Sequence, residues 1–166
     1  MKSIYKKLGL ALITIVLLGS ILMIKLRLND NQPLKSPDPK ELESIVLINF
    51  LQGKGTNKIT IKEELDMEEF LQVFTRAKRT KMESTSDFPD KEEFMLVIYR
   101  FKSGGNGIRS LYREDGELFV DQPYMGVFKI KKDDIEILDR LVEDAYKEDI
   151  SIELDDMLDA LVKDNF

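Results

Sequence analysis

The 166-residue chain contains neither cysteine nor histidine. This absence excludes zinc sites built from Cys or His, Ser-His-Asp and Cys-His catalytic systems, thiol redox chemistry and haem attachment. It also excludes disulfides, so core packing alone must hold the folded domain together. We therefore predict a protein that is not an enzyme and has no metal site and no cofactor. Any catalysis would have to use carboxylates, lysine, tyrosine or serine.

Acidic residues outnumber basic ones after the N-terminus. The chain has 25 basic and 31 acidic residues, of which residues 1–35 hold 6 and 1, leaving 19 and 30 for residues 36–166, a net charge of −11. Such a field repels phosphate backbones and anionic lipid headgroups and attracts cations or basic proteins. We expect no nucleic-acid binding, although the charge is equally explained by solubility alone.

Charged residues are also absent from Leu8 to Ile24, which reads LGLALITIVLLGSILMI. As a helix this run would span roughly 25 Å, close to the shortest length that crosses a bilayer, and flanking basic side chains can snorkel to lengthen it. A cleaved signal has a shorter apolar core and small residues at its cleavage site, whereas Gly19-Ser20 lies inside the run. We predict an uncleaved membrane anchor at residues 1–28, with secretion after signal cleavage as the alternative.

The flanks of this run predict its orientation. Three lysines and the amino terminus precede it, whereas two basic residues and then Asp30 follow it. Because positive flanks are retained in the cytoplasm, we expect a single-pass protein in the cell membrane, with its N-terminus inside and its domain outside. The reverse orientation, with a cytoplasmic domain, is the alternative.

The chain after the anchor divides into a spacer and one domain. Residues 29–43 hold three prolines and no apolar periodicity, which is typical of a stiff polar spacer. Residues 44–166 are long enough for a single domain with one modest core.

Alternation and turn residues predict the strands of this domain. They lie at Ser44–Leu51, Lys58–Lys62, Glu93–Lys102, Ile108–Glu114, Glu117–Asp121 and Val127–Lys131. The turn signals SGGNG and Asp115-Gly116 supply the positive φ angles of tight hairpins, so the third to fifth strands should form an antiparallel meander. SGGNG is therefore interpreted as a hairpin turn rather than a phosphate-binding loop, which would need a following helix.

Three helices are predicted from apolar periodicity. The first lies in LDMEEFLQVFTRAKRT, with Asp66 as its cap, Glu69 in capping-box position and Leu65 packing on Phe70 as a staple. Its apolar stripe is Met67, Phe70, Leu71 and Phe74. The second helix begins near Asp133, and the third runs from about Ile152 to Val162.

The resulting order, ββαβββ(β)αα, predicts an α+β fold. Hairpins rather than crossovers favour a single antiparallel sheet with its helices packed on one face. The other face would then be open, either wetted by solvent or used as a docking surface.

Paired carboxylates are abundant, as in Glu68-Glu69 and Asp155-Asp156. A glycosidase needs two carboxylates facing each other across a cleft, but adjacent acids on a helix point in different directions. The acidic stretch REDGELFVD lacks the alternating oxygen ligands of an EF-hand loop. Capping residues and solvated helix faces explain these acids more simply than a catalytic or calcium site does.

One stretch, DGELFVDQPYMGVFKI, carries a resemblance together with the AKRTKMESTSDFPDKEEF segment before it. It resembles small secreted or membrane-anchored domains of unknown function from Gram-positive bacteria. The similarity covers roughly residues 44–142, and residues 150–166 look like an additional tail. The matching residues are Asp87, Pro89, Gly116, Asp121, Gln122, Pro123, Tyr124, Gly126 and Phe128. The resemblance implies an exported location and an α+β fold, and it brings no activity.

DQPYMG, within that stretch, predicts a turn that begins at its proline, with Gly126 free to take a positive φ. Tyr124 would either fill the core or stand exposed. As a simple turn the segment only leads into the next strand. As a recognition loop on a rigid sheet it would bind through Asp121, Gln122 and Tyr124, with Gly126 shaping the turn.

Two functions from different classes remain open. The first is a non-enzymatic, membrane-tethered binding or regulatory module that faces the cell wall and binds a protein, a peptide or a wall component. A variant of it is an inhibitor or immunity protein for a cationic enzyme, whose binding would weaken steeply with salt. The second is a carboxylate-based hydrolase acting on wall glycans.

Overall fold

The computed structural model describes residues 33–162. The chain divides into two compact units, Met1–Gln32 and Pro33–Phe166, and all described residues belong to the second. The predicted anchor at residues 1–28 therefore lies outside the described residues. Within the described part, no helix is long and apolar enough to cross a membrane.

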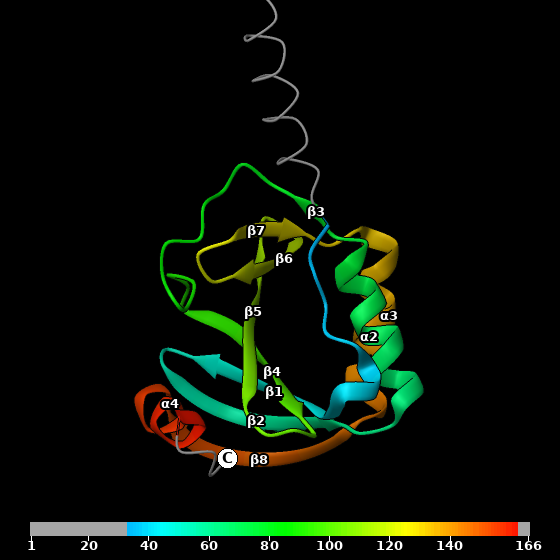
Figure 1. Cartoon of the computed structure of the whole chain (residues 1–166). Helices are drawn as coiled ribbons and strands as arrows, with labels where there is room; N and C mark the ends of the chain where they lie inside the picture. Colours follow the sequence, from blue (N-terminus) through cyan, green and yellow to red (C-terminus); the bar gives the residue numbers. More distant parts are fainter. Residues whose placement is uncertain (1–32, 163–166) are drawn as a thin grey trace, which may run out of the picture. The chain divides into compact units, whose positions relative to one another are not determined.

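Eleven helices and strands and one short 3-10 turn make up the described chain (Figure 1). In order they are η1 (Pro39–Glu41), β1 (Leu42–Leu51), β2 (Lys54–Ile61), α2 (Glu64–Thr75), β3 (Lys78–Arg79), β4 (Glu93–Phe101), β5 (Asn106–Glu114), β6 (Glu117–Gln122), β7 (Gly126–Lys129), α3 (Lys132–Asp144), β8 (Tyr146–Glu153) and α4 (Leu154–Val162).

All eight strands form one sheet in the order β3-β7-β6-β5-β4-β1-β2-β8. Every neighbouring pair is antiparallel, which confirms the predicted α+β class and its single antiparallel sheet. The predicted meander is confirmed as β4, β5 and β6. Asp115 and Gly116, with φ of 51° and 76°, make the tight turn between the last two of these strands.

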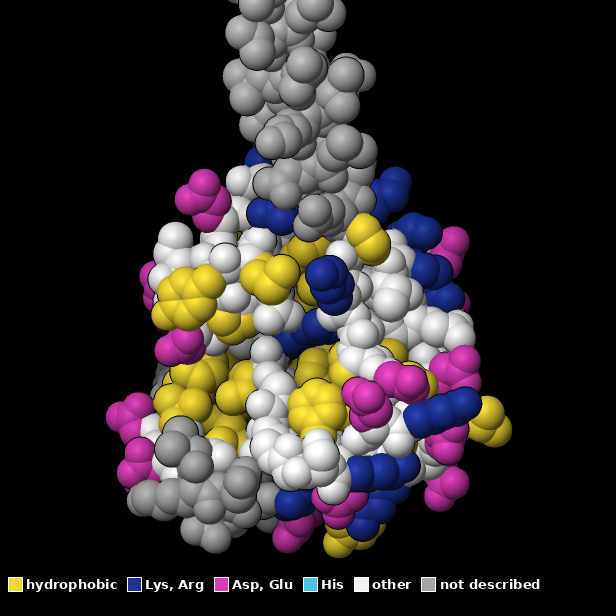
Figure 2. All heavy atoms as spheres, viewed as in Figure 1, with side chains coloured by type: hydrophobic (Ala, Val, Ile, Leu, Met, Phe, Trp, Pro, Cys, Tyr) yellow, Lys and Arg dark blue, Asp and Glu magenta, His cyan; other side chains and the backbone are white. Residues whose placement is uncertain are grey.

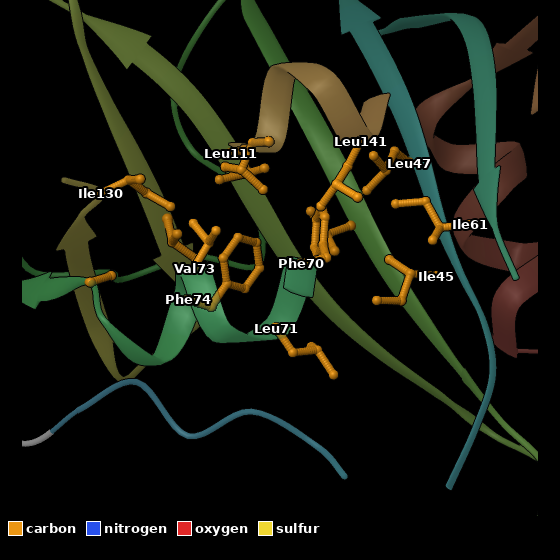
Figure 3. Packing of buried hydrophobic residues seen from close by; sticks show 14 of the residues in the cluster. Ile45, Leu47, Ile61, Phe70, Leu71, Val73, Phe74, Leu111, Ile130 and Leu141 are labelled. Carbon is orange, nitrogen blue, oxygen red and sulfur yellow. The ribbon is translucent and has the colours of Figure 1, made fainter. Parts of the chain in front are cut away.

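The main core lies between the sheet and the helices α2 and α3, on what we call the helical face. The predicted α2 stripe is buried there, with Phe70 and Phe74 fully enclosed. Figure 3 shows these rings pointing at apolar side chains of the strands, such as Ile45 and Leu47 of β1. Alternation along β1 places Val46, by contrast, on the opposite face.

The opposite face is not open, which corrects the prediction that all helices pack on one face. A second core lies there, in which Met157 and Leu161 of α4 pack with Ile48, Phe50 and Leu96 of the sheet. Figure 1 shows α4 on the other side of the sheet from α2 and α3. The cause is β8, a strand between α3 and α4 that the sequence did not reveal and that carries the chain along the edge of β2.

Strand β8 has few of the signals by which strands are recognised. It reads YKEDISIE, and its only aliphatic residues are Ile150 and Ile152. It lies at the edge of the sheet with most of its side chains exposed, so charged residues are tolerated and the usual alternation is weak. The third predicted helix therefore begins two residues late, at Leu154.

Helix α2 begins earlier than predicted. Its N-cap is Glu63, without a side-chain capping hydrogen bond, and Asp66 lies inside the first turn. Leu65 is 79% exposed, so it does not form the predicted staple with Phe70. The acids of the first turn still interact favourably with the positive end of the helix dipole.

The predicted spacer is partly folded. Leu34 is buried in the main core, and residues 39–41 form η1 directly before β1. The Ser36 hydroxyl donates a hydrogen bond of 3.4 Å to the Leu71 carbonyl of α2. Residues 34–43 therefore belong to the domain, because Leu34 and Leu42 give this proline-containing stretch apolar contacts with the core.

Candidate functional site

The predicted loop is a tight turn between β6 and β7, here called the β6–β7 turn (residues 122–126). The Met125 N–H donates to the Gln122 carbonyl at 3.0 Å, which closes a four-residue turn with Pro123 in its second position. Tyr124 follows with φ of 59°, and Gly126 has φ of 129°. A positive φ is uncommon for a bulky residue, so Tyr124 occupies a strained position where glycine or asparagine is normally preferred.

The four predicted residues have different surroundings. Tyr124 is 68% exposed, whereas Asp121 is only 7% exposed and points to the face that carries α4. Gln122 is half-buried, and its amide oxygen accepts a hydrogen bond from Arg109. Gly126 is buried, and a Cβ there would lie 3.2 Å from the Arg79 guanidinium. Of the four, Tyr124 alone has a largely exposed side chain.

Residues 80–92, here called the facing segment, lie against this turn. The Thr80 N–H and hydroxyl both donate to the Val127 carbonyl, at 2.9 and 2.8 Å. The Val127 N–H donates to the Met82 carbonyl at 3.4 Å. Farther along, the Asp87 carboxylate lies beside the Tyr124 hydroxyl, and its negative charge raises the pKa of that tyrosine. Two segments distant in sequence therefore build one surface.

This surface exposes apolar side chains. Met82, Tyr124 and Met125 are 39%, 68% and 50% exposed, and the Met82 carbonyl accepts its hydrogen bond from Val127, two residues after Met125. Figure 2 shows hydrophobic side chains reaching the surface on the side of the domain that carries the β6–β7 turn. Tyrosine and methionine are enriched at protein interfaces, where they supply large contact areas.

Beneath the surface lies a buried polar cluster. Asp121 sits opposite Ser110 in the ladder, and the Asp121 Oδ1, Ser110 Oγ and Ser84 Oγ atoms are buried without a hydrogen-bond partner among the described residues. Burial raises the pKa of Asp121, and the nearby Ser84 hydroxyl partly opposes this rise. Burial, followed by the charges of Asp121 and Glu114, raises the pKa of Tyr112 to about 12.

Arg109 connects the turn to the start of the domain on the helical face. Its guanidinium is buried and donates to the Gln122 amide oxygen, to the Lys35 carbonyl and, at 3.2 Å, to the Tyr99 hydroxyl. It also lies 5.9 Å from the centre of the Phe74 ring. Burial raises the pKa of Tyr99, and the charge of Arg109 opposes that rise. No described carboxylate forms an ion pair with Arg109, so neutral acceptors hold this buried charge.

A separate pocket of about 200 Å³ opens between α3 and the strands β4 and β5. Apolar side chains line most of it, namely Phe70, Met95, Leu111, Leu118, Leu138 and Val142, and Glu93, Arg113 and Asp139 are its charged residues. Arg113 and Asp139 form an ion pair of 3.2 Å between largely exposed side chains. Residues 33–162 contain no group of three or more Asp, Glu, His or Cys side chains that could hold a metal ion.

Comparison with known proteins identifies a family without an assigned activity. The DUF5301 family model, described as "Domain of unknown function (DUF5300)", matches residues 30–129, more than half of the chain. No curated protein matches the sequence. A solved structure, titled "NMR structure of the protein from Ruminococcus gnavus", is 20% identical and has a TM-score of 0.48, covering 60% of this chain and 96% of its own. A likeness of this size carries no functional information.

Proposed function

The chain belongs to the DUF5301 family of domains of unknown function, and we propose that it is a non-enzymatic binding module. In this proposal the N-terminal segment tethers the domain to the outer side of the cell membrane, facing the cell wall. The module recognises a protein or peptide through the β6–β7 turn and the facing segment. The observation that carries the proposal is Tyr124, which is strained and exposed and has the Asp87 carboxylate beside its hydroxyl.

Tyr124 combines three properties that a simple connecting turn does not need. Its φ of 59° costs free energy that glycine at the same position would avoid. Its ring is 68% exposed, so the strain is not offset by burial. Its hydroxyl lies beside the Asp87 carboxylate of the facing segment, which gives the ring a neighbour before any partner arrives. Fixing an aromatic side chain in advance lowers the conformational entropy lost on binding.

The location outside the membrane is proposed from the sequence. Residues 8–24 are uncharged and long enough to span a bilayer, and the lysines before them favour an N-terminus inside the cell. A mass measurement on protein recovered from membranes tests the tether. Loss of the first 20 or so residues would show a cleaved signal in place of an anchor.

Hydrolysis by carboxylates is the second candidate, because the pocket beside α3 is lined by both Glu93 and Asp139. Asp139 is already paired with Arg113 and its side chain is 64% exposed. A general acid needs a pKa raised toward neutrality, which burial provides and an arginine partner opposes. These features favour a binding module over a carboxylate-based hydrolase. Release of sugar from wall glycans by the purified chain, lost in Glu93→Gln, would support the hydrolase instead.

The recognition surface is tested by photo-crosslinking from position 125 in the full-length chain in its own cells. We expect a discrete adduct from Met125 that disappears when Tyr124→Ala is added. A crosslinker at Tyr146 is the matched control, since Tyr146 is 70% exposed on β8, at the far edge of the sheet. Equal adducts from both positions, or an adduct at 125 that survives Tyr124→Ala, would contradict the proposal. A cationic partner would in addition be released by salt.

A further inference from the structure

The acidic domain has one basic edge. Residues 76–81 (RAKRTK) and 127–132 (VFKIKK) together hold seven basic residues and no acid, so the remaining positions of residues 36–166 carry 12 basic and 30 acidic residues. Strands β3 and β7 bring the two segments together, with Lys78 directly opposite Lys129. Figure 2 shows Lys and Arg side chains gathered over the end of the domain that carries β3 and the start of α3.

Most of this charge is not neutralised within the domain. Lys78, Lys81, Lys131 and Lys132 are exposed, and none of them forms an ion pair with a described residue. Two other members are paired, Lys129 with Glu117 at 2.8 Å and Arg76 with Asp134 at 2.7 Å. Lys131 and Lys132 also occupy the N-terminal end of α3, where the helix dipole is positive and lysine is unfavourable. The arrangement concentrates positive potential at one end, which favours an anionic surface as its partner.

The chain joins the domain at this same end. The Lys35 carbonyl accepts a hydrogen bond from Arg109, which also binds Gln122. Gln122 pairs with Gly126 of β7, against which the Arg79 guanidinium of β3 lies. Figure 1 likewise shows the blue start of the described chain and β3 at one end of the domain.

Little chain separates this end from the predicted anchor. The apolar stretch extends at most to Leu28, and Leu34 is already buried in the core. Six residue steps cover at most about 20 Å in any conformation. If the membrane span extends to Leu28, this length limits how far Leu34 can lie from the lipid headgroups.

We propose that the basic edge of β3, β7 and the start of α3 docks on anionic phospholipid headgroups of the membrane that holds the anchor. The inference rests on the proposed tether. It revises the expectation from net charge that the domain is repelled by such lipids, because the domain turns its basic end toward the membrane and its acidic surface away. Docking also sets the direction in which the β6–β7 turn is presented to a partner.

The test uses the full-length chain reconstituted in vesicles of phosphatidylcholine alone or of equal parts phosphatidylcholine and phosphatidylglycerol. Since the chain has no cysteine, Glu83→Cys beside the edge, or Ser103→Cys in the β4–β5 turn, gives a single site for a fluorophore. Energy transfer to a headgroup dye reports the distance of that site from the bilayer. We expect anionic lipid to raise transfer from position 83 and leave position 103 less affected.

Each lysine near an anionic surface changes docking by about 5-fold, so Lys81→Glu, Lys131→Glu and Lys132→Glu combined should lower the ratio of docked to undocked domain by at least about 100-fold. The control reverses Lys40, Lys62 and Lys147, which gives the same net charge and should leave docking intact. High salt should also abolish docking. The proposal would be overturned if energy transfer from position 83 did not depend on lipid charge, or if it fell equally in both triple variants. The lysines would then serve to protect the sheet edge from pairing with another chain.

Carbonate washing of the same vesicles separates the two proposals. A chain that stays bound after washing, with transfer insensitive to lipid charge, retains its tether but does not dock. A chain that washes off lacks the tether, and the docking proposal then fails with it.

Discussion

The two edges of the sheet differ in charge and in backbone geometry. At the β3–β7 edge, basic residues, a strained turn and unpaired buried polar atoms occur together. The β8 edge is acidic, since residues 143–159 hold eight acids and one lysine, and it is an extended strand whose register with β2 shifts between Gly55 and Asn57. Each edge exposes one tyrosine, Tyr124 at 68% and Tyr146 at 70%. The two tyrosines are thus equally exposed, and they differ in the positive φ of Tyr124 and in the Asp87 carboxylate beside its hydroxyl.

The family match includes the β3–β7 edge and excludes the β8 edge. It covers residues 30–129, which include β1 to β7 and the β6–β7 turn, whereas α3, β8 and α4 lie beyond it. The C-terminal segment adds a strand to the edge of β2 and places α4 over the second core. Function proposed for the turn thus concerns the part shared with the family, and the β8 edge serves as an internal reference for each experiment.

The largest expected effect compares a buried charge on the central strand β5, which contacts the β6–β7 turn, with an exposed charge beside the β8 edge. Arg109→Met removes the donor to Gln122, Tyr99 and the Lys35 carbonyl, and we expect the free energy of unfolding to fall by about 1.5–3 kcal/mol. Lys54→Met removes the exposed Lys54–Glu153 pair that joins β2 to β8, at a cost below about 1 kcal/mol. Urea unfolding of both variants, followed by circular dichroism, measures the difference. Equal losses would show that Arg109 contributes no more than a surface ion pair.

Substitution of Asp121 should change the free energy of unfolding by less, and the change should depend on pH. Burial raises its pKa in the folded state above the unfolded value of about 3.9. Folding then favours the protonated form, so the contribution of Asp121 to stability is greatest below the unfolded pKa and falls as pH rises through the folded pKa. We expect Asp121→Asn to stabilise the protein at neutral pH by about 1 kcal/mol or less, a gain that shrinks as pH falls through the folded pKa and is absent below the unfolded pKa.

Unfolding midpoints of wild type and Asp121→Asn across this pH range test the assignment. Glu148→Asn on β8, an exposed carboxylate, is the control and should show no comparable gain at neutral pH. A difference between the wild type and Asp121→Asn that stays constant at all pH values would mean that ionisation of this carboxyl is not what costs stability.

The features that the sequence predicted are local ones. Hairpins depend on adjacent turn residues such as Asp115 and Gly116, and the α2 stripe depends on spacing within one helix. Both features depend on residues that are close in the chain, so they can be predicted from the sequence. The turn at Tyr124 was predicted for the same reason, because proline and glycine frame it.

The remaining features depend on contacts between distant residues. Arg109 meets a carbonyl 74 positions away, and Tyr124 meets Asp87 across 37 residues of sequence. The side of the sheet on which α4 packs depends on β8. This edge strand has too many charged residues to show the alternation by which strands are recognised. Periodicity describes one element at a time, and it cannot show which faces or which charges come together.

The smallest expected effect is on the two exposed tyrosines, for which glycine substitution should change the free energy of unfolding in opposite directions. Tyr124→Gly relieves a positive φ, and we expect it to stabilise the fold by roughly 0.5–1 kcal/mol while removing the crosslink to the partner. Tyr146→Gly places glycine in an extended strand and should destabilise by a similar amount. Thermal unfolding of the two variants decides the matter. If Tyr124→Gly also destabilises, the strain at this position is offset by the contact with Asp87, and the exposed ring serves the fold rather than a partner.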